Sequence, residues 1–386
     1  MKRYVHILLN SGQFQSRVMK EARTALESGL FDQVHIIGKK GRADHALPDF
    51  ETLAPDITLE RVHVPDKAGG VPARLGARIT WMINAVRRGV AAKGAAVSVH
   101  HVMLLPVGVL VKLLCGARLV YDAHELETES ASLVNSPGAK RVTKIIEWAF
   151  LRFVDQIIVV SEPIGDWYRA RHSAPVTAIH NYPRRIVASQ VKSSLRLIHD
   201  IPEDQTVFIY QGAIQANRGI HLLLQVFTSG MVPNGVLVLM GYGAMAGDAQ
   251  AAADASPHIR YQPAVPPDQI LSYTGSADVG LCVFDAVCRS YALAMPNKLF
   301  EYIQAGLPVV VGSPLSAMSN VVRERGIGLT SELSLAALAS ALNEMCRSDR
   351  SAMLVAVEGA AGEFTWENEE PRLARVYAAL GARSGG

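Results

Sequence analysis

The chain has 386 residues, of which 49% are hydrophobic and 19% are charged, a balance that excludes general disorder and supplies apolar material for large buried cores. Its 38 Lys and Arg residues against 35 Asp and Glu residues give a formal net charge of +3, which argues against a nucleic acid as the main partner. At roughly 150 residues per domain, this length predicts two or three domains, and two is the simplest fit.

The first half of the chain alternates short β-branched runs with segments of helical length. The opening residues have two basic side chains but only a short apolar run, which predicts a buried first strand rather than a secretory signal. Such alternation is typical of a doubly wound α/β sheet, whose ligands bind at the carboxyl ends of the strands. The predicted buried parallel strands are Tyr4–Leu9, Gln33–Ile37, Ala96–His100, Leu119–Asp122 and Gln156–Ser161.

A second series of the same kind follows the turn-rich stretch Asn181–Ser194. Its predicted strands are Val207–Tyr210, Val236–Met240, Val279–Val283 and Val309–Gly312, with helical patterns between them. The tail from Trp366 has apolar residues three or four apart, which predicts an amphipathic helix.

The two series predict an α/β protein of two Rossmann-like, doubly wound parallel-sheet domains. We expect a first domain at residues 1–180, a linker at 181–200, a second domain at 201–365 and a terminal helix at 366–386.

A glycine turn, Asn10-Ser-Gly12, follows the first predicted strand, and Arg17 and Glu21 come after it on a helical pattern. Because α/β domains bind ligands at the carboxyl ends of their strands, Gly12 is a candidate binding residue. An ordinary strand-to-helix connection also explains this turn.

Residues 73–93 combine Arg74, Arg78, Arg87, Arg88 and Lys93 with Trp81 and other apolar residues, which predicts a basic amphipathic helix or a pair of helices. Such a helix can lie on an anionic membrane surface, so peripheral contact with the inner membrane surface is one interpretation. A solvated surface helix is the other.

A polar cluster ends the predicted strand Leu119–Asp122, in the sequence Tyr121-Asp-Ala-His-Glu125. His124 is the candidate reactive residue, because reactive groups of α/β folds gather at this end of a strand. A structural or solvent-facing histidine is the alternative, and Asp122 and Glu125 could cap and orient the loop.

The segment Tyr210-Gln-Gly-Ala-Ile-Gln-Ala-Asn-Arg-Gly219 leads from a predicted strand into a predicted helix at Ile220–Phe227. Free backbone N–H groups and the positive end of a helix dipole make such a junction an anion site, which implicates Gly212 and Gly219. Arg218 adds a full charge suited to phosphate, although it could instead be a solvated residue at the start of the helix.

The segment Met295-Pro-Asn-Lys-Leu-Phe-Glu-Tyr-Ile-Gln-Ala-Gly306 predicts a helix that starts near Pro296 and ends at Gly306, before the strand Val309–Gly312. Lys298 and Glu301 are three residues apart, so they could form a surface ion pair worth about 0.3–0.5 kcal/mol. Alternatively, Glu301 accepts hydrogen bonds from ribose hydroxyls and Lys298 contacts a diphosphate.

The run PNKLFEYIQAGLPVVV resembles the nucleotide-sugar signature of the retaining family 4 glycosyltransferases, which have the GT-B fold of two domains facing across a cleft. The resemblance implies that Glu301 holds the donor ribose and that Gly212, Arg218 and Gly219 form the diphosphate-binding turn, with Arg218 where lysine is usual. It also implies that Asn297 and Lys298 contact the donor, that His124 of YDAHE faces the transferred sugar, and that the Gly12 loop is close to donor and acceptor. The terminal helix would then cross back onto the first domain.

Two positions depart from this family pattern. Ala213 stands where an arginine often follows the first turn glycine, so one phosphate contact is missing or replaced, for which Lys298 is a candidate. Leu293 stands where the first member of a glutamate pair is usual, eight residues before Glu301, which puts recognition of the transferred sugar in question. Backbone N–H groups of residues 294–297 could serve instead.

The resemblance implies transfer of a sugar from a nucleotide-diphosphate sugar to a glycan or lipid-linked acceptor, with retention, in bacterial surface-polysaccharide or glycolipid assembly. The chain has no DxD-type aspartate pair to hold Mg²⁺ or Mn²⁺, so we expect no metal and no separate cofactor. The four cysteines have no CxxC spacing, and the longest apolar stretch is shorter than a membrane span, so we expect a cytoplasmic protein.

Two alternatives stay open at this point. A nucleotide-sugar epimerase could use the same architecture, and Ala213 and Leu293 would suit a non-catalytic scaffold with a transferase-like fold. An NAD enzyme is disfavoured, because no GxGxxG follows the first predicted strand.

Overall fold

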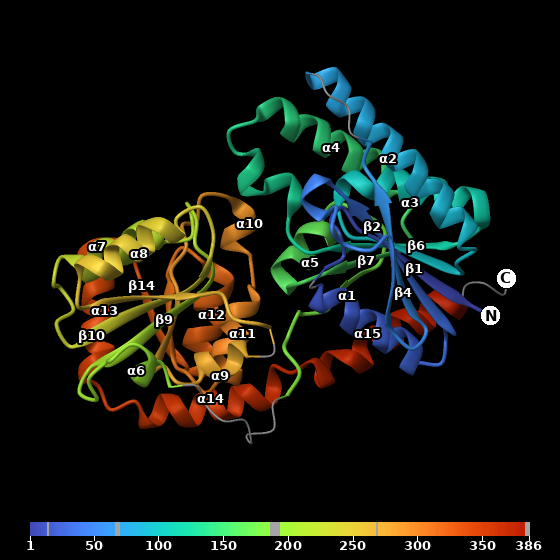
Figure 1. Cartoon of the computed structure of the whole chain (residues 1–386). Coiled ribbons are helices and arrows are strands. Elements are labelled where there is room, and N and C mark those ends of the chain that lie inside the picture. Colours follow the sequence, from blue (N-terminus) through green and yellow to red (C-terminus); the bar gives the residue numbers. More distant parts are fainter. Residues whose placement is uncertain (14, 66–69, 186–193, 268, 383–386) are drawn as a thin grey trace. The chain divides into compact units, whose positions relative to one another are not determined.

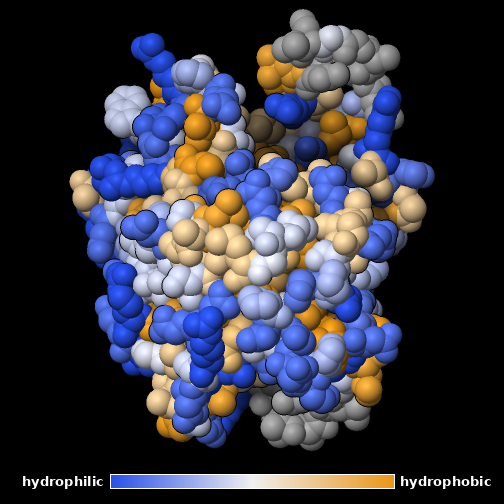
Figure 2. Space-filling view, turned by 90° about the vertical axis from the view of Figure 1, so that its left-hand side faces the viewer, coloured by the Kyte–Doolittle hydropathy of each residue, from blue (hydrophilic) through white to orange (hydrophobic). Residues whose placement is uncertain are grey.

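Residues 1–13, 15–65, 70–185, 194–267 and 269–382 are described in this computed structural model, which divides into two compact units (Figure 1). Unit 1 comprises Met1–His180 and Glu369–Gly386, and unit 2 comprises Asn181–Asn368. In the described part of the chain, no helix is both long enough and apolar enough to traverse a bilayer. Figure 2 shows one face of the molecule, on which hydrophilic and hydrophobic side chains are interspersed.

Unit 1 is built on an eight-stranded sheet, as far as its described residues show, in the order β3-β4-β2-β1-β5-β6-β7-β8. All neighbouring pairs are parallel except β3 and β4 at one edge. The strands are β1 (Arg3–Ile7), β2 (Gln33–Lys40), β3 (Phe50–Ala54), β4 (Ile57–His63), β5 (Ala96–Val99), β6 (Arg118–Ala123), β7 (Gln156–Val159) and β8 (Val176–Ala178).

The helices of unit 1 form layers over this sheet. They are α1 (Ser16–Glu27), α2 (Val71–Ala91), α3 (Leu105–Cys115), α4 (Pro137–Leu151), α5 (Glu162–Arg169) and α15 (Trp366–Ala382). Helices α2, α3 and α4 lie side by side over one face, and α1 and α15 cover the other (Figure 1). On that second face Tyr377 of α15 packs edge-on against Tyr4 of β1 and Phe31.

Unit 2 has a fully parallel six-stranded sheet, within the residues described, in the order β11-β10-β9-β12-β13-β14. The strands are β9 (Thr206–Ala213), β10 (Gly235–Tyr242), β11 (Ile259–Pro263), β12 (Val279–Cys282), β13 (Val309–Gly312) and β14 (Gly328–Ser331). The helices are α6 (Leu195–Ile198), α7 (Ile220–Thr228), α8 (Ala246–Ala255), α9 (Ile270–Thr274), α10 (Arg289–Ala292), α11 (Asn297–Gln304), α12 (Ser316–Arg325), α13 (Leu335–Arg347) and α14 (Ser351–Glu363).

Each face of this second sheet has its own apolar core. One core joins the sheet to α7, α8 and α13 through residues such as Leu223, Phe227 and Leu342. The other joins it to α11, α12 and α14 through residues such as Phe300, Met318 and Val357. Side chains of adjacent positions in β9 point alternately into the two cores, as period-two geometry requires. The prediction of two parallel-sheet α/β domains is therefore confirmed.

The basic stretch 73–93 forms one helix, α2, rather than two, and Lys93 follows its end. Trp81 is buried against unit 1 and donates a hydrogen bond to the carbonyl of Val62. Arg78, Arg87 and Arg88 are exposed, and the side chain of Arg74 lies outside the described residues.

Candidate active site

The strand β9 carries the first part of the site in unit 2. It continues through Gly212 and Ala213, paired with Gly241 and Tyr242 of β10, so the predicted turn at Gly212 is wrong: this glycine is at the end of a strand. The pairing of β9 with β10 extends to Ala213, so the chain is still in a strand at Gly212 and turns only after it. Gly212 has a φ of 118°, and a Cβ at this position would lie 3.8 Å from Lys298 Nζ. The absent side chain thus keeps the Lys298 ammonium accessible at the end of β9.

Gly219 brings the start of α7 against the end of β12. It has a φ of 76°, and a Cβ there would lie 2.2 Å from the carbonyl oxygen of Val283. No larger residue fits without moving this backbone, because real Cβ contacts are never so short. The first turn of α7, with its unpaired N–H groups, is therefore held close to the carboxyl end of the sheet.

Arg218 directly precedes this helix, and its guanidinium lies over two aromatic rings. Its Cζ is 5.1 Å from the centre of the Tyr291 ring and 5.9 Å from that of Phe284. The Nε atom is buried and has no hydrogen-bond partner among the described residues. A buried N–H of a cation without a partner is costly, which makes Arg218 a natural binder of an anion.

Lys298 is on the first turn of α11, which starts after Pro296 as predicted. Its Nζ lies 3.7 Å from the centre of the Tyr210 ring. The pKa of Lys298 is lowered from 10.5 to about 8, mainly by burial; the charge of Arg218 also lowers it, whereas Cys282 and Glu301 act in the opposite sense. Arg218 and Lys298 thus place two positive charges in one region, which favours an anionic ligand there.

Glu301 is one helical turn after Lys298 and is half-buried, so the two do not form a pair on a solvated helix face. Gln211, at the end of β9, donates a hydrogen bond from Nε2 to Glu301 Oε2. The hydroxyl of Thr274 contacts Oε1 of the same amide. Because the amide turns its NH2 group to the carboxylate, its oxygen faces Thr274, which must be the donor.

Sequence reasoning missed Gln211 and Thr274, although Gln211 is a polar residue in an otherwise apolar strand. A buried polar side chain needs a partner, so a glutamine in an apolar strand could have indicated a functional contact at Gln211. The backbone N–H of Gln211 also donates to the hydroxyl of Tyr302, 3.0 Å away, which ties β9 to α11.

Asn297 is the first residue of α11 and is exposed. Its Oδ1 accepts a hydrogen bond of 2.8 Å from Nδ2 of Asn181. This contact uses the side-chain oxygen, so the Nδ2 group of Asn297 and the backbone N–H groups at the start of α11 are the donors that can serve an anion. The structure thus brings Gly212, Arg218, Lys298 and Glu301 into one region, with Gly219 and Asn297 at the starts of its two helices.

His124 and Gly12 belong to unit 1. The backbone N–H of Gly12 donates to Asn10 Oδ1 at 3.0 Å, and Arg61 holds the same loop through a 2.9 Å hydrogen bond to the carbonyl of Ser11. His124 follows β6, and its Nε2 lies 2.8 Å from Asp122 Oδ2. Asp122 therefore orients this histidine from within the strand rather than capping a loop.

Arg17 contacts both oxygens of Asp122, with Nη2 2.8 Å from Oδ1 and Nε 3.1 Å from Oδ2. The same Nε is 2.9 Å from Glu21 Oε1. All three side chains are at most 4% exposed. Arg17 and Glu21 are thus parts of a buried polar network rather than groups that face solvent, and burial together with Asp122 raises the pKa of the Glu21 carboxyl.

Two groups in this network have a spacing that a metal ion could use. They are His6, Glu21 and His100, and His100, Asp122 and His124, whose candidate ligand atoms lie within 4.8 Å of one another in each group. The Arg17 guanidinium already pairs with the Asp122 carboxylate, and its charge opposes a second cation there.

Both halves of the chain match a family model. Residues 15–182 match the model described as Glycosyltransferase Family 4, and residues 205–348 match the model described as Glycosyl transferases group 1. Among curated proteins, none matches the chain in sequence.

Solved structures share the fold at low sequence identity. A sucrose-phosphate synthase from Thermosynechococcus elongatus is 16% identical with a TM-score of 0.77, over 99% of this chain and 100% of that one. Anabaena HepE in complex with UDP-glucose is 14% identical with a TM-score of 0.73, over 98% and 100%. WaaG, a glycosyltransferase involved in lipopolysaccharide biosynthesis, is 15% identical with a TM-score of 0.66, over 100% of both chains.

Proposed function

We propose that this chain, which belongs to the family 4 glycosyltransferases, moves a sugar from a nucleoside-diphosphate donor to a hydroxyl of an acceptor. The observation that carries the proposal is the pair of cations in unit 2, Arg218 and Lys298, next to the carboxylate of Glu301. A diphosphate satisfies the buried Nε of Arg218 and stabilises the protonated form of Lys298.

In this proposal the donor diphosphate lies between the end of β9 and the starts of α7 and α11. Gly212 keeps the approach to Lys298 open, and Gly219 holds α7 close enough for its N–H groups to help. Glu301 accepts hydrogen bonds from the ribose hydroxyls, while Gln211 fixes one of its oxygens. Asn297 contributes through the backbone at the start of α11.

The same groups stabilise the departing nucleoside diphosphate during transfer. Positive charges fixed in place before the reaction stabilise charge that develops on the leaving group, so this chemistry needs no metal ion. His124 contacts the transferred sugar. Transfer proceeds with retention of the anomeric configuration, which the resemblance of PNKLFEYIQAGLPVVV to the retaining enzymes supports.

UDP-sugars are the first donors to test, because similar folds have been solved with UDP-glucose and with UDP-2-fluoro glucose. A thermal-shift screen of UDP, GDP, dTDP and CDP sugars identifies the base, since a ligand that binds the folded state raises its melting temperature. Calorimetry on the best donor then compares wild type with Arg218→Ala and Lys298→Ala, with Lys140→Ala on α4 as the matched control.

Each rival function predicts a different outcome of these measurements. A non-catalytic scaffold binds no nucleoside diphosphate. An epimerase converts the donor into a new nucleotide sugar without any acceptor. Donor binding that is lost in both site variants and kept in the control, together with sugar transfer only when an acceptor is present, supports the proposed function.

We place the acceptor among glycans or lipid-linked saccharides of bacterial surface-polysaccharide or glycolipid assembly. Support for contact with an anionic membrane comes from the outer layer of unit 1, where α2, α3 and α4 expose large apolar side chains. These are Leu75, Ile79 and Ile83 of α2, Leu110, Leu113 and Leu114 of α3, and Val142, Ile145 and Trp148 of α4.

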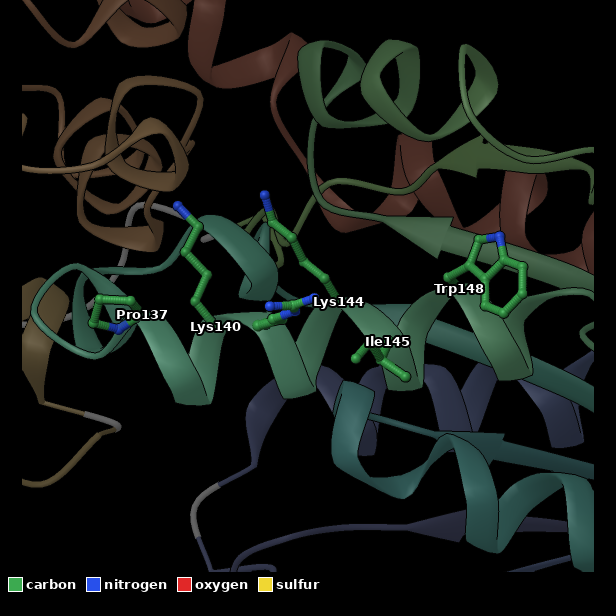
Figure 3. Close-up of a pocket in the computed structure, with 6 residues that line it drawn as sticks. Pro137, Lys140, Lys144, Ile145 and Trp148 are labelled. Carbon is green, nitrogen blue, oxygen red and sulfur yellow. The ribbon is translucent and has the colours of Figure 1, made fainter.

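Basic side chains accompany the apolar ones on this layer. A hollow of about 370 Å³ lies along α4 and is lined by Lys140, Lys144, Ile145 and Trp148 among others. Figure 3 shows these side chains along the helix. The two lysines share the single negative charge of Glu129, so an excess of positive charge remains beside Trp148. Apolar side chains with a cationic surround are complementary to anionic lipid.

A further inference from the structure

Three histidines of unit 1 form a continuous chain from the interior to His124. His6 Nδ1 lies 2.8 Å from His100 Nε2, and His100 Nδ1 lies 3.1 Å from His124 Nε2. Asp122 Oδ2 is 2.9 Å from His100 Nδ1 and 2.8 Å from His124 Nε2. The side chains of His100 and Asp122 are at most 3% exposed, and that of His124 is 34% exposed.

Asp122 is ionised and needs donors. Burial by itself would raise the pKa of this carboxyl, but Arg17, His124 and His100 hold the pKa well below its ordinary value. A carboxylate oxygen can only accept hydrogen bonds. The two ring nitrogens that face Oδ2 must therefore both carry protons, namely Nε2 of His124 and Nδ1 of His100.

His6, at the interior end of this row of three histidines, fits the same arrangement. Burial lowers the pKa of both His6 and His100, so each neutral ring carries one proton. With its proton on Nδ1, His100 can only accept at Nε2, which makes Nδ1 of His6 the donor. His6 Nε2 is then unprotonated, and it has no hydrogen-bond partner among the described residues. A buried nitrogen lone pair without a partner costs less than a buried N–H without one.

The reverse tautomer of His124 is disfavoured by the same contacts. It would place the lone pair of Nε2 against a carboxylate oxygen 2.8 Å away. Both described polar contacts of His124 involve Nε2: it donates to Asp122, and it lies beside His100 Nδ1, which donates to the same oxygen. Nδ1 is therefore the nitrogen that remains for a ligand.

We propose that Asp122 and His100 are positioning residues that hold His124 with its proton on Nε2, so that His124 recognises its ligand as an acceptor, through a hydroxyl that donates to Nδ1. The part of this inference that concerns the ligand rests on the proposed function, in which that hydroxyl belongs to the donor sugar. The tautomer itself does not depend on the activity.

The tautomer is measured by nitrogen-15 long-range correlation spectra of the ¹⁵N-histidine-labelled protein at pH 8, with His124→Gln to assign the ring. We expect the His124 spectrum of a ring protonated on Nε2. A proton on Nδ1, or rapid exchange between the two forms, overturns the proposal.

Asp122→Asn tests the same arrangement from the other side. Arg17 contacts both oxygens of Asp122, with Nη2 2.8 Å from Oδ1 and Nε 3.1 Å from Oδ2, so an amide places its NH2 group against an arginine donor in either orientation. The variant removes the carboxylate charge that holds the proton on His124 Nε2, and we expect the form protonated on Nε2 to lose its dominance. His6→Leu is the matched control. It removes a buried ring from the same row of histidines but leaves the hydrogen bond from His100 Nδ1 to Asp122 intact.

Activity identifies which ring nitrogen of His124 contacts the ligand. The amide of His124→Asn occupies the place of Nδ1, whereas the amide of His124→Gln occupies the place of Nε2. We expect His124→Asn to keep kcat/KM within about tenfold of wild type and His124→Gln to lose about 100-fold or more. The reverse order overturns the proposal, even if Asp122→Asn fails to fold. If no donor supports any transfer, the proposed function fails, and the spectra still decide the tautomer.

Discussion

The ammonium nitrogen of Lys298 lies 3.7 Å from the centre of the Tyr210 ring, at the open end of β9. A ring face attracts a cation but offers it no hydrogen-bond acceptor in place of lost water. The lowered pKa of Lys298, about 8, reflects this burial. Lys298 therefore loses its charge at mildly alkaline pH, and a bound diphosphate would favour the protonated form there.

Affinity for a nucleoside diphosphate should therefore fall with pH above 8. A diphosphate favours the protonated lysine, so the free protein must take up a proton on binding once the pH exceeds the pKa of Lys298. We expect affinity to fall by up to about tenfold per pH unit above that pKa. Calorimetry at pH 8.5 in two buffers of different ionisation enthalpy measures the proton uptake directly. Lys298→Arg should bind with little pH dependence between pH 7.5 and 9.5, and a wild-type profile in this variant would contradict the assignment.

Glu301 should be the residue that distinguishes ribose from deoxyribose. Removing a sugar hydroxyl leaves a wild-type carboxylate without a donor, whereas Glu301→Ala has no carboxylate to leave unpaired. We expect a 2′,3′-dideoxy nucleoside diphosphate to bind wild type about tenfold more weakly than the ribose form, and Glu301→Ala to bind both forms equally. Equal discrimination by the two proteins would show that Glu301 does not contact the ribose.

Gln211 and Thr274 should act on donor binding through Glu301. Gln211→Leu removes the hydrogen bond that fixes the carboxylate, so we expect the KM for the donor to rise by about five- to tenfold with a much smaller change in kcat. Thr274→Val should have the same effect, and Thr274→Ser should restore wild-type behaviour because it keeps the hydroxyl. A fall in kcat alone would mean that these residues act elsewhere in the reaction.

The cores and the central strands could be predicted from the sequence because burial on both faces leaves continuous apolar runs, as in Val309–Gly312. Edge strands such as β3 and β14 could not, and neither could β4 beside β3, in which buried and partly buried residues alternate. In β3 and β14 most side chains are only partly buried, so Phe50–Ala54 and Gly328–Ser331 lack such a run. Their pairing depends on neighbours far away in the chain.

The candidate site also contains some residues that could be predicted from the sequence and others that could not. Glu301, Arg218 and His124 stand in local motifs, so they could be selected before the fold was known. The partners Gln211 and Thr274 are 63 residues apart, and His6 and His100 are 94 residues apart. Only the order of strands in each sheet brings such residues together, and no local pattern encodes that order.

Glu147 on α4 should destabilise the protein at alkaline pH. Burial raises its pKa to about 7, although Tyr168 donates a hydrogen bond to Oε1 at 2.9 Å. Between pH 4.5 and 7 the folded state keeps a proton that the unfolded state has released, so the contribution of Glu147 to stability falls as the pH rises through this window.

Glu147→Gln keeps an acceptor for Tyr168 and removes the buried charge. We expect this variant to be more stable than wild type by about 2 kcal/mol at pH 8, with no difference below pH 4. Urea unfolding at both pH values measures this, and Glu358→Gln, at an exposed position of α14, is the control. A variant that is less stable than wild type at pH 8 would contradict the sign.

The outer layer of unit 1 should bind anionic vesicles. Ile79 and Ile83 are each 48% exposed on α2, and replacing both with Glu adds negative charge where the apolar surface would meet the lipid. We expect this double variant to lose at least about tenfold of the binding to phosphatidylglycerol vesicles in a sedimentation assay. Leu354→Glu with Val355→Glu, on α14 of unit 2, should bind as wild type does. Equal binding by both double variants would exclude this layer as the contact.

Because residues 369–382 of α15 complete the packing around Tyr4 and Phe31, unit 1 is assembled from two stretches that are synthesised far apart in time. During translation the first 180 residues leave the ribosome with one face of their sheet covered by α1 but not yet by α15. Nearly the whole of unit 2 is synthesised before α15 completes that cover. A chaperone that shields this face, or a slow ribosome, would therefore affect the yield of the first unit more than that of the second.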